Sequence, residues 1–214
     1  NFQRVRTDAE LKEAEAAGLW QAQALVKQIG ESSEKITIAT ILFIHKVFFQ
    51  HVNPDMAGRF RKSGEDIKKL KYIFPPPGTA VQPEMYTFWR ELDTKLARVP
   101  LLSKTGGKNA QKIRNKAVVE LAVWTQYKIA SIHPFCEGNG RMARLLTNLI
   151  LYRHGFQPTD IKYEGENKKA YIDALGAIDL KSDFRPLQQL IVKGIINSYK
   201  KLVSTQKKYA LKKH

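Results

Sequence analysis

The sequence predicts an all-α domain arranged around a central helix–loop–helix, with a short β-hairpin flap at one edge. Apolar residues recur at helical spacing through most of the chain, and Gly and Pro separate the helical stretches. Only residues 71–74 combine aromatic and β-branched residues in the way that short strands do. A length of 214 residues is enough for one sizeable core, so we expect a single domain over 1–214.

Two helices are predicted in the first quarter of the chain. Residues 8–28 are rich in Ala and Glu, and Gly30 is expected to end the helix that they form. Ser32 or Ser33 is expected to cap the second helix, which Asn53-Pro54 closes. Its broad apolar surface predicts burial, and the loop 58–64 follows it.

A small exposed ribbon is predicted at Lys71–Phe74, because the three prolines that follow exclude both a helix and a central strand. An amphipathic helix is expected over 82–98. The next helix, about 111–131, is apolar nearly all round and should therefore lie in the middle of the domain. Further helices are expected at 141–153, ending near Gly155, and at 167–178 and 184–206.

The chain is strongly basic, with a formal net charge of +16. This charge predicts attraction to polyanions such as nucleic acid, an acidic membrane surface or a phosphate-bearing ligand. Much of it lies near the C-terminal end, where a solvated basic tail is the simpler interpretation. The longest apolar run, 36–49, contains polar residues and is too short to span a membrane.

The location of the protein is predicted from its cysteine content and its first residues. Cys136 is the single cysteine, which excludes an intramolecular disulfide and fits a reducing compartment, so we expect a cytoplasmic protein. The first residues predict no signal peptide, and the absence of an initiator Met suggests a trimmed or excised fragment, which leaves open whether flanking domains were removed.

The residues 133–144, HPFCEGNGRMAR, carry the strongest chemical signal. His133 precedes a proline at a helix-to-loop junction, and an ordinary histidine pKa of ~6.5 suits proton abstraction at neutral pH. Gly138, Asn139 and Gly140 allow the backbone to approach a ligand closely. Because a helix begins there, its unpaired amide groups would form a cradle for an anion.

Charged residues flank this cradle. Arg141 and Arg144 lie three residues apart on one side of the following helix and offer forked donors to phosphate oxygens. Glu137 stands just before the cradle, where bound phosphates would repel its carboxylate unless a cation lay between them. Mg²⁺ is therefore the expected cofactor, with Glu137 as its ligand.

This segment resembles the signature of the Fic family, HPFx[D/E]GNGRxxR, at every specified position. The resemblance implies an adenylyltransferase in which His133 deprotonates a Ser, Thr or Tyr hydroxyl of a target protein. The hydroxyl would attack the α-phosphate of ATP, so that AMP is transferred. The remaining implied roles are an anion hole (Gly138, Asn139, Gly140), clamps on the β- and γ-phosphates (Arg141, Arg144), an Mg²⁺ ligand (Glu137) and a buried anchor (Phe135).

The resemblance extends over about residues 37–157, which would form the core of a Fic-like helical bundle. It includes the segment from Ile44 to Arg61, and it implies that residues 71–77 form a flap. Tyr72, Ile73 and Phe74 of this flap would pair with an extended segment of the target. Residues 1–30 would be an N-terminal helix with a candidate regulatory role, and residues 158–214 would be C-terminal helices and a basic tail.

Two family features depart from the pattern or leave alternatives open. Many Fic proteins carry an inhibitory helix with the pattern [S/T]xxxE[G/N], which is not intact here. Glu15 is the nearest match and is hypothesised to pair with Arg144, against the alternative of an exposed helix charge; a separate inhibitory protein is a further option. Gly140 stands where phosphate-transferring relatives of the Doc type have Lys, which argues against phosphate transfer. The motif leaves open whether the protein transfers UMP or phosphocholine, or removes AMP from a target.

A nucleic-acid-binding helical module is the rival function. It is supported by a pI of about 9.9 and by a run of basic residues between 59 and 71. Such a module would not need His133, Glu137 and two glycines in one register, whereas an ATP-dependent transferase needs them all. The basic residues that support the nucleic-acid-binding interpretation are Arg59, Arg61, Lys62, Lys68, Lys69 and Lys71.

We expect His45 to be a core histidine and Cys136 to point away from the site.

Overall fold

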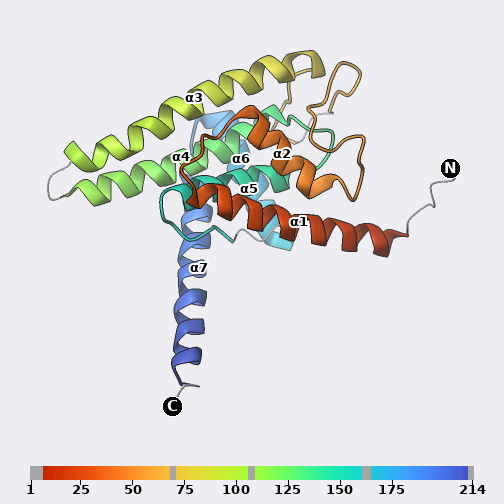
Figure 1. The fold of residues 1–214 in the computed structure, drawn as a ribbon. Helices are drawn as coiled ribbons and strands as arrows, with labels where there is room; N and C mark the ends of the chain where they lie inside the picture. The colour runs from red at the N-terminus through yellow and green to blue at the C-terminus, as the bar shows by residue number, and fades with distance from the viewer. Residues whose placement is uncertain (1–6, 68–70, 106–108, 161–164, 212–214) are drawn as a thin grey trace.

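The computed structural model describes the whole chain except residues 1–6, 68–70, 106–108, 161–164 and 212–214. Its described residues form seven α-helices, which confirms the predicted all-α class (Figure 1). No helix among them is both long and apolar enough to cross a membrane. The helices are α1 (Asp8–Glu31), α2 (Ile38–Phe49), α3 (Gly78–Thr105), α4 (Ala110–Ile132), α5 (Asn139–Arg153), α6 (Gly165–Lys181) and α7 (Arg185–Leu211).

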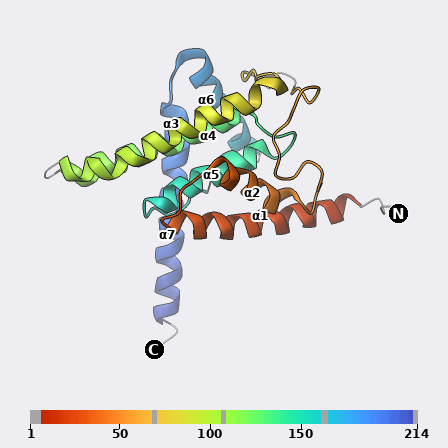
Figure 2. The same cartoon turned by 45° about the horizontal axis from the view of Figure 1, so that its top comes forward.

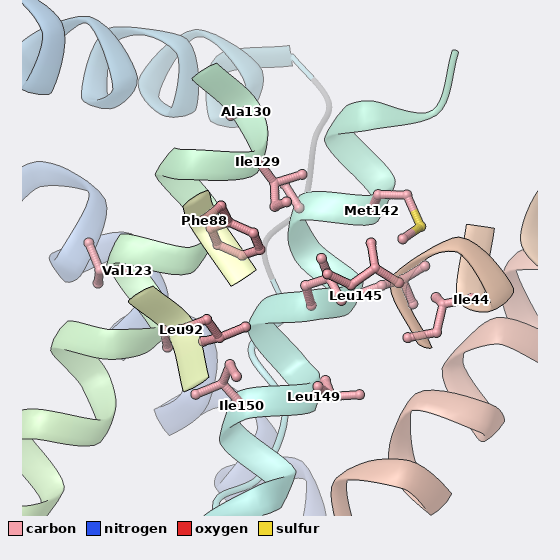
Figure 3. Packing of buried hydrophobic residues seen from close by; sticks show 14 of the residues in the cluster. Ile44, Phe88, Leu92, Val123, Ile129, Ala130, Met142, Leu145, Leu149 and Ile150 are labelled. Atoms are coloured by element: carbon pink, nitrogen blue, oxygen red, sulfur yellow. The ribbon is translucent and has the colours of Figure 1, made fainter. Parts of the chain in front are cut away.

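Helix α5 lies in the middle of the bundle and begins with the residues of the conspicuous motif. It packs against α4 on one side and α1 on the other, while α3 runs back along α4 and α2 lies on α1 (Figures 1 and 2). Leu145 and Leu149 of α5 belong to one apolar cluster with Leu92 of α3 and Ile44 of α2 (Figure 3). The first turn of α5 is therefore held by the core itself.

Helix α1 approaches its neighbours through two glycines. A Cβ atom at Gly18 would lie 2.2 Å from the carbonyl oxygen of Phe48, and one at Gly30 would lie 2.5 Å from the Cβ of Tyr152. Gly30 was expected to end α1, but the helix continues to Glu31. The sequence signal was interpreted wrongly because this glycine permits close helix packing instead of a left-handed cap.

The start of α2 also differs from the prediction. Its N-cap is Thr37, which forms a reciprocal capping box with Thr40, whereas Ser32 and Ser33 lie in the preceding connection. The hydroxyl of Ser32 donates to the carbonyl oxygen of Ile29 and so closes the end of α1. Both residue types are good caps, so local sequence could not decide which of them begins the next helix.

The predicted β-hairpin is not formed by the described residues. Ile73 is a single bridge residue, and Lys71 has a positive φ of 48°, which interrupts an extended strand. Ile73 is buried, and the ring of Tyr72 lies against Gly176 of α6, where a Cβ would be 2.3 Å from its Cδ2 atom. Residues 71–77 are thus an irregular segment anchored on α6.

Helix α7 leaves the bundle at an angle, and its C-terminal half projects beyond the other helices (Figures 1 and 2). Its first turns are fixed by buried Leu187 and Ile191. At Gly194, the Thr159 side chain takes the space of a Cβ atom, and its hydroxyl donates to the carbonyl oxygen of Ile191. From Tyr199 to Lys208 every residue is exposed.

Candidate active site

A cavity of about 980 Å³ opens where the ends of α4 and α5 meet. All the residues of the motif that were assigned to catalysis, phosphate binding or metal binding line it. Its other walls come from α1, from the segment 71–73 and from α6. The motif residues in its lining are His133, Cys136, Glu137, Gly138, Asn139, Gly140, Arg141 and Arg144.

His133 is the C-cap of α4 and adopts a left-handed conformation, with φ 50° and ψ 59°. Its backbone N–H donates to the carbonyl oxygen of Ile129. Its Nδ1 atom lies 3.2 Å from the carbonyl oxygen of Ala130, which can only accept, so Nδ1 carries the proton in the neutral ring. The other nitrogen, Nε2, then keeps its lone pair and can serve as a base.

The electrostatic environment keeps His133 neutral. Partial burial lowers the pKa of its imidazole, and the nearby Arg61 guanidinium lowers it further, against a hydrogen bond to Ala130 and the charge of Glu137, which raise it. A neutral imidazole is the form that can accept a proton.

Arg61 holds the backbone around His133 through hydrogen bonds from its side chain and its backbone N–H. Its side chain is almost fully buried, and its Nε donates to the carbonyl oxygen of His133 at 2.7 Å. Its Nη2 donates to the carbonyl oxygen of Pro76 at 2.6 Å, and its backbone N–H donates to Pro134. One guanidinium thus ties the catalytic-motif backbone to the end of the segment 71–77.

Asn139 and His45 shape the loop after His133. The Asn139 amide accepts from the backbone N–H of Phe135 and donates to the Phe135 carbonyl oxygen, which closes the loop onto the start of α5. Phe135 is fully buried, as expected of an anchor, and its ring stacks on His45 at 3.8 Å. His45 accepts from the Gly58 N–H through Nδ1 and donates from Nε2 to the Glu137 carbonyl oxygen.

The first turn of α5 presents its amides to the cavity. Gly138, the N-cap, has a φ of 81° and no side chain to cap the helix, and the first intrahelical bond is that from Met142 to Gly138. The preceding amides therefore have no partner within the helix. A Cβ at Gly138 would lie 2.6 Å from Phe48, whereas one at Gly140 would meet Arg144 only at an ordinary 3.6 Å. Gly140 is therefore not required by packing.

Glu15 reaches the motif across the cavity. Its carboxylate accepts a hydrogen bond from Nη1 of Arg141 at 2.7 Å, and the Arg141 guanidinium also lies over the ring of Phe48. The expected partner of Glu15 was Arg144, but the Glu15 carboxylate accepts its hydrogen bond from Arg141, three residues earlier. The interpretation of Glu15 as a mere exposed helix charge is wrong.

Glu137 has the surroundings expected of a divalent-cation ligand. Its side chain is 63% exposed, faces the cavity and accepts from the Gly138 N–H at 3.0 Å. Among the described residues no group of three or more His, Cys, Asp or Glu side chains could hold a metal by itself. The residues fit Mg²⁺, which is often bound by one or two carboxylates together with phosphate oxygens of a substrate.

Comparison with known proteins agrees with this geometry. The family model described as Fic/DOC family matches residues 35–151, more than half of the chain. The chain belongs to the Fic/DOC family. It is 30% identical over 184 residues to the protein adenylyltransferase Fic of Nematostella vectensis, and 31% identical over 156 residues to that of Culex quinquefasciatus. These alignments cover 86% and 73% of this chain but only 38% and 27% of the two relatives.

Solved Fic structures share the fold. Fic-1 (residues 134–508) from C. elegans superposes with a TM-score of 0.69 at 24% identity, covering 98% of this chain and 56% of that one. The BepC protein of Bartonella tribocorum, with bound AMPPNP, gives a TM-score of 0.59 at 16% identity, covering 91% of this chain and 90% of the other. The arrangement of helices around the motif is thus the Fic arrangement.

Several predicted residues behave differently from the sequence-based expectation. Cys136 was expected to point away but lines the cavity. Burial and the neighbouring Glu65 raise the pKa of its thiol. Arg61 was assigned to an exposed basic patch and is instead buried. Only its place in the family-like segment 44–61 hinted at a site role, because two of its carbonyl partners, on Ile132 and His133, lie 71 and 72 residues away in the sequence.

The three flap residues divide between the cavity and the surface. Tyr72 and Ile73 line the cavity, whereas Phe74 is 68% exposed on the outside. Lys71 pairs with Asp173 of α6 at 2.7 Å. The segment therefore forms one wall of the cavity and also exposes an apolar side chain.

Proposed function

We propose that this protein is an adenylyltransferase that transfers AMP from ATP to a Ser, Thr or Tyr hydroxyl of a target protein. The observation that carries the proposal is that an oriented, neutral His133 and the first amides of α5, which have no partner within the helix, face one cavity. The relatives named protein adenylyltransferase Fic and the AMPPNP bound to BepC support the same nucleotide chemistry.

In the proposed reaction each group of this chain has one task. Nε2 of His133 takes the proton of the target hydroxyl, whose oxygen attacks the α-phosphorus of ATP. The bond from the α-phosphorus to the bridging oxygen breaks, and pyrophosphate leaves with that oxygen. The amides of Asn139 and Gly140 would bind phosphate oxygens, and Arg141 and Arg144 would bind the β- and γ-phosphates.

Glu137 would hold Mg²⁺ together with oxygens of the nucleotide. When bound, the ion would neutralise charge on the phosphates and so favour departure of pyrophosphate. Its proximity to Arg141, at 3.7 Å, would help to order both side chains around a triphosphate.

The test is incubation of the purified protein with α-labelled and, separately, γ-labelled ATP, with Mg²⁺ and a cell lysate as the source of targets. Label is scored as the increase over the same lysate without the protein, because kinases of the lysate also transfer the γ-phosphate. Label from the α-position alone is expected on protein, and His133→Ala should abolish it. His154→Ala serves as a matched control, because His154 is a partly buried histidine outside the cavity. Label from the γ-position would overturn AMP transfer in favour of phosphate transfer.

We also propose that Glu15 lowers the activity by holding Arg141. An arginine that donates to the Glu15 carboxylate must exchange that bond before it can bind a phosphate, and the carboxylate itself would repel the phosphates. A separate inhibitory protein that supplies a comparable acidic side chain is a further proposal.

We also propose that the protein is located in the cytoplasm, where a single cysteine stays reduced and ATP is available.

The target is proposed to meet the segment 71–77, where the exposed Phe74 offers an apolar contact. The nucleic-acid-binding interpretation loses support because three of the four described basic residues named for it bind other groups of the chain; the fourth, Lys62, is exposed. Arg59 forms a bidentate pair with Glu65, Arg61 binds backbone carbonyls, and Lys71 pairs with Asp173. Lys68 and Lys69 lie outside the described residues.

Transfer of another phosphate-linked group by the same site remains the second candidate function, and the labelling experiment separates it from AMP transfer.

A further inference from the structure

The projecting half of α7 carries an apolar stripe that the other described residues leave exposed. Ile196, Tyr199 and Val203 follow one another at intervals of three and four residues, the spacing that places side chains on one face of a helix. They are 48%, 40% and 47% exposed, and Leu202 beside them is 39% exposed. We call these four residues the α7 stripe.

A row of lysines borders the α7 stripe on one flank. Lys193, Lys200 and Lys207 lie seven residues apart, so they stack along the helix with only about 20° of drift per step. All three are exposed. Lys201 and Lys208 point to the opposite side, where Lys201 pairs with Asp160 of the bundle at 2.5 Å.

The charge of this part of the chain is entirely of one sign. After Asp183 the sequence contains eight Lys and Arg residues and no Asp or Glu. The row of lysines therefore finds no acidic partner on α7 itself, and a second copy of α7 could not supply one either. Exposed residues of a projecting helix also gain little from tertiary packing, which normally provides most of a helix's stability.

We propose that the α7 stripe docks an amphipathic helix of a partner protein whose apolar residues are bordered by Asp or Glu. The stripe has the three-and-four spacing through which two helices interlock, and the single lysine row matches the flanking charge positions of such a pair. An anionic membrane surface would attract the lysines on both sides of the helix alike, so the comparison of Lys207 with Lys208 below separates it from a partner helix. Nucleic acid would leave the apolar residues unexplained.

The test uses the full chain and a labelled synthetic peptide about three heptads long, with Leu at the three-and-four positions and Glu at the flanking positions. Fluorescence anisotropy should detect binding, and the same peptide with Lys in place of Glu should bind at least about tenfold more weakly. Tyr199→Ser should also weaken binding about tenfold without changing the melting temperature, since this side chain is exposed.

The matched pair Lys207→Glu and Lys208→Glu decides whether the face matters. Both variants change the net charge equally, but only Lys207 borders the stripe, so Lys207→Glu should weaken peptide binding about tenfold and Lys208→Glu less than about twofold. Equal losses in the two variants, or no binding of the peptide, would overturn the proposal. So would tighter, face-independent binding to duplex DNA or phosphatidylserine vesicles, or a dimer in sedimentation that Tyr199→Ser dissociates.

Discussion

At the scale of single residues, hydrogen bonds fix the states in which the motif residues can act. In the proposed mechanism His133 can serve as the base because its Nδ1 proton is directed to the Ala130 carbonyl oxygen, which leaves Nε2 free to accept a proton. Arg61 holds the same turn through the carbonyl oxygens of Ile132 and His133. A buried guanidinium bound to carbonyls is costly to replace, so this turn has one well-defined conformation.

The acidic limb of the pH–rate profile should reflect the lowered pKa of His133. Protonation removes the base, and burial and Arg61 shift that protonation to lower pH. Because kcat/KM reports ionisation in the free enzyme, the profile of label transfer should reach half its plateau below the ordinary histidine value of ~6.5. A midpoint above that value would contradict the assigned environment.

Gly138 and Gly140 should respond differently to the same substitution. Gly138→Ala forces a side chain into a φ of 81° and against Phe48, so the free energy of unfolding should fall by about 2 kcal/mol. Gly140→Ala meets only Arg144 at 3.6 Å, so the melting temperature should hardly change while ATP binding weakens about tenfold. Thermal melts and calorimetric titration with ATP would measure the two effects, and a stable Gly138→Ala variant would refute the distinction.

At the scale of elements, helix α1 brings a charge from one end of the sequence to the motif at residue 141. The sequence could not show which arginine of the motif Glu15 meets, because it gives the order of residues and not the rotation of α1 about its axis. Gly18 sets that rotation by packing against the backbone of Phe48. The same contact positions Glu15 beside Arg141.

Removal of the Glu15 charge should raise both ATP affinity and label transfer. Glu15→Gln preserves helix propensity but loses the charged hydrogen bond to Arg141, so the dissociation constant for ATP should fall about tenfold. Glu13→Gln is the matched control, because Glu13 is an exposed residue of the same helix outside the cavity. Equal effects of the two variants in ATP titration would exclude a specific role for Glu15.

The helices themselves could largely be predicted from periodicity, and their ends less well. Residues 111–131 were expected to form a central helix, and α4 spans Ala110–Ile132. The flap was misjudged because Ile73 was interpreted as part of a strand on local composition, whereas it is buried beside α6. The roles of Arg61 and His45 depend on partners 72 and 92 residues away, which no local pattern reveals.

At the scale of the whole molecule, one buried histidine couples the site to overall stability. His45 is fully buried, and its two nitrogens join the loop at Gly58 to the motif at Glu137. Burial is the main cause that lowers its pKa from 6.5 to about 4. A neutral His45 imidazole, buried in the core, is therefore needed to hold the motif loop in place.

Acid should destabilise the protein through this residue. The unfolded chain binds a proton near pH 6.5 and the folded chain only near pH 4, so stability present above pH 6.5 is lost as the pH falls through that window. The shift corresponds to about 3 kcal/mol. Urea unfolding at pH 7 and pH 4.5 should show this loss.

A His45→Gln variant, which starts less stable, should lose less over the same pH range than the parent protein. His154 has its pKa lowered to about 4 as well, so His154→Gln measures the part of the loss that comes from outside the site. An unchanged pH dependence in His45→Gln would contradict the coupling.

The two glycine contacts of α1 divide the helix into unequal parts. From Gly18 onward it is locked to its neighbours, but none of residues 8–17 is buried, and Glu15 belongs to this outer part. The outer turns can therefore exchange between wound and unwound forms while the core stays closed, with the Thr7–Glu10 capping box favouring the wound form. The fraction of molecules in which Glu15 holds Arg141 would then vary continuously with the local helix–coil equilibrium, and inhibition would be graded instead of all-or-none.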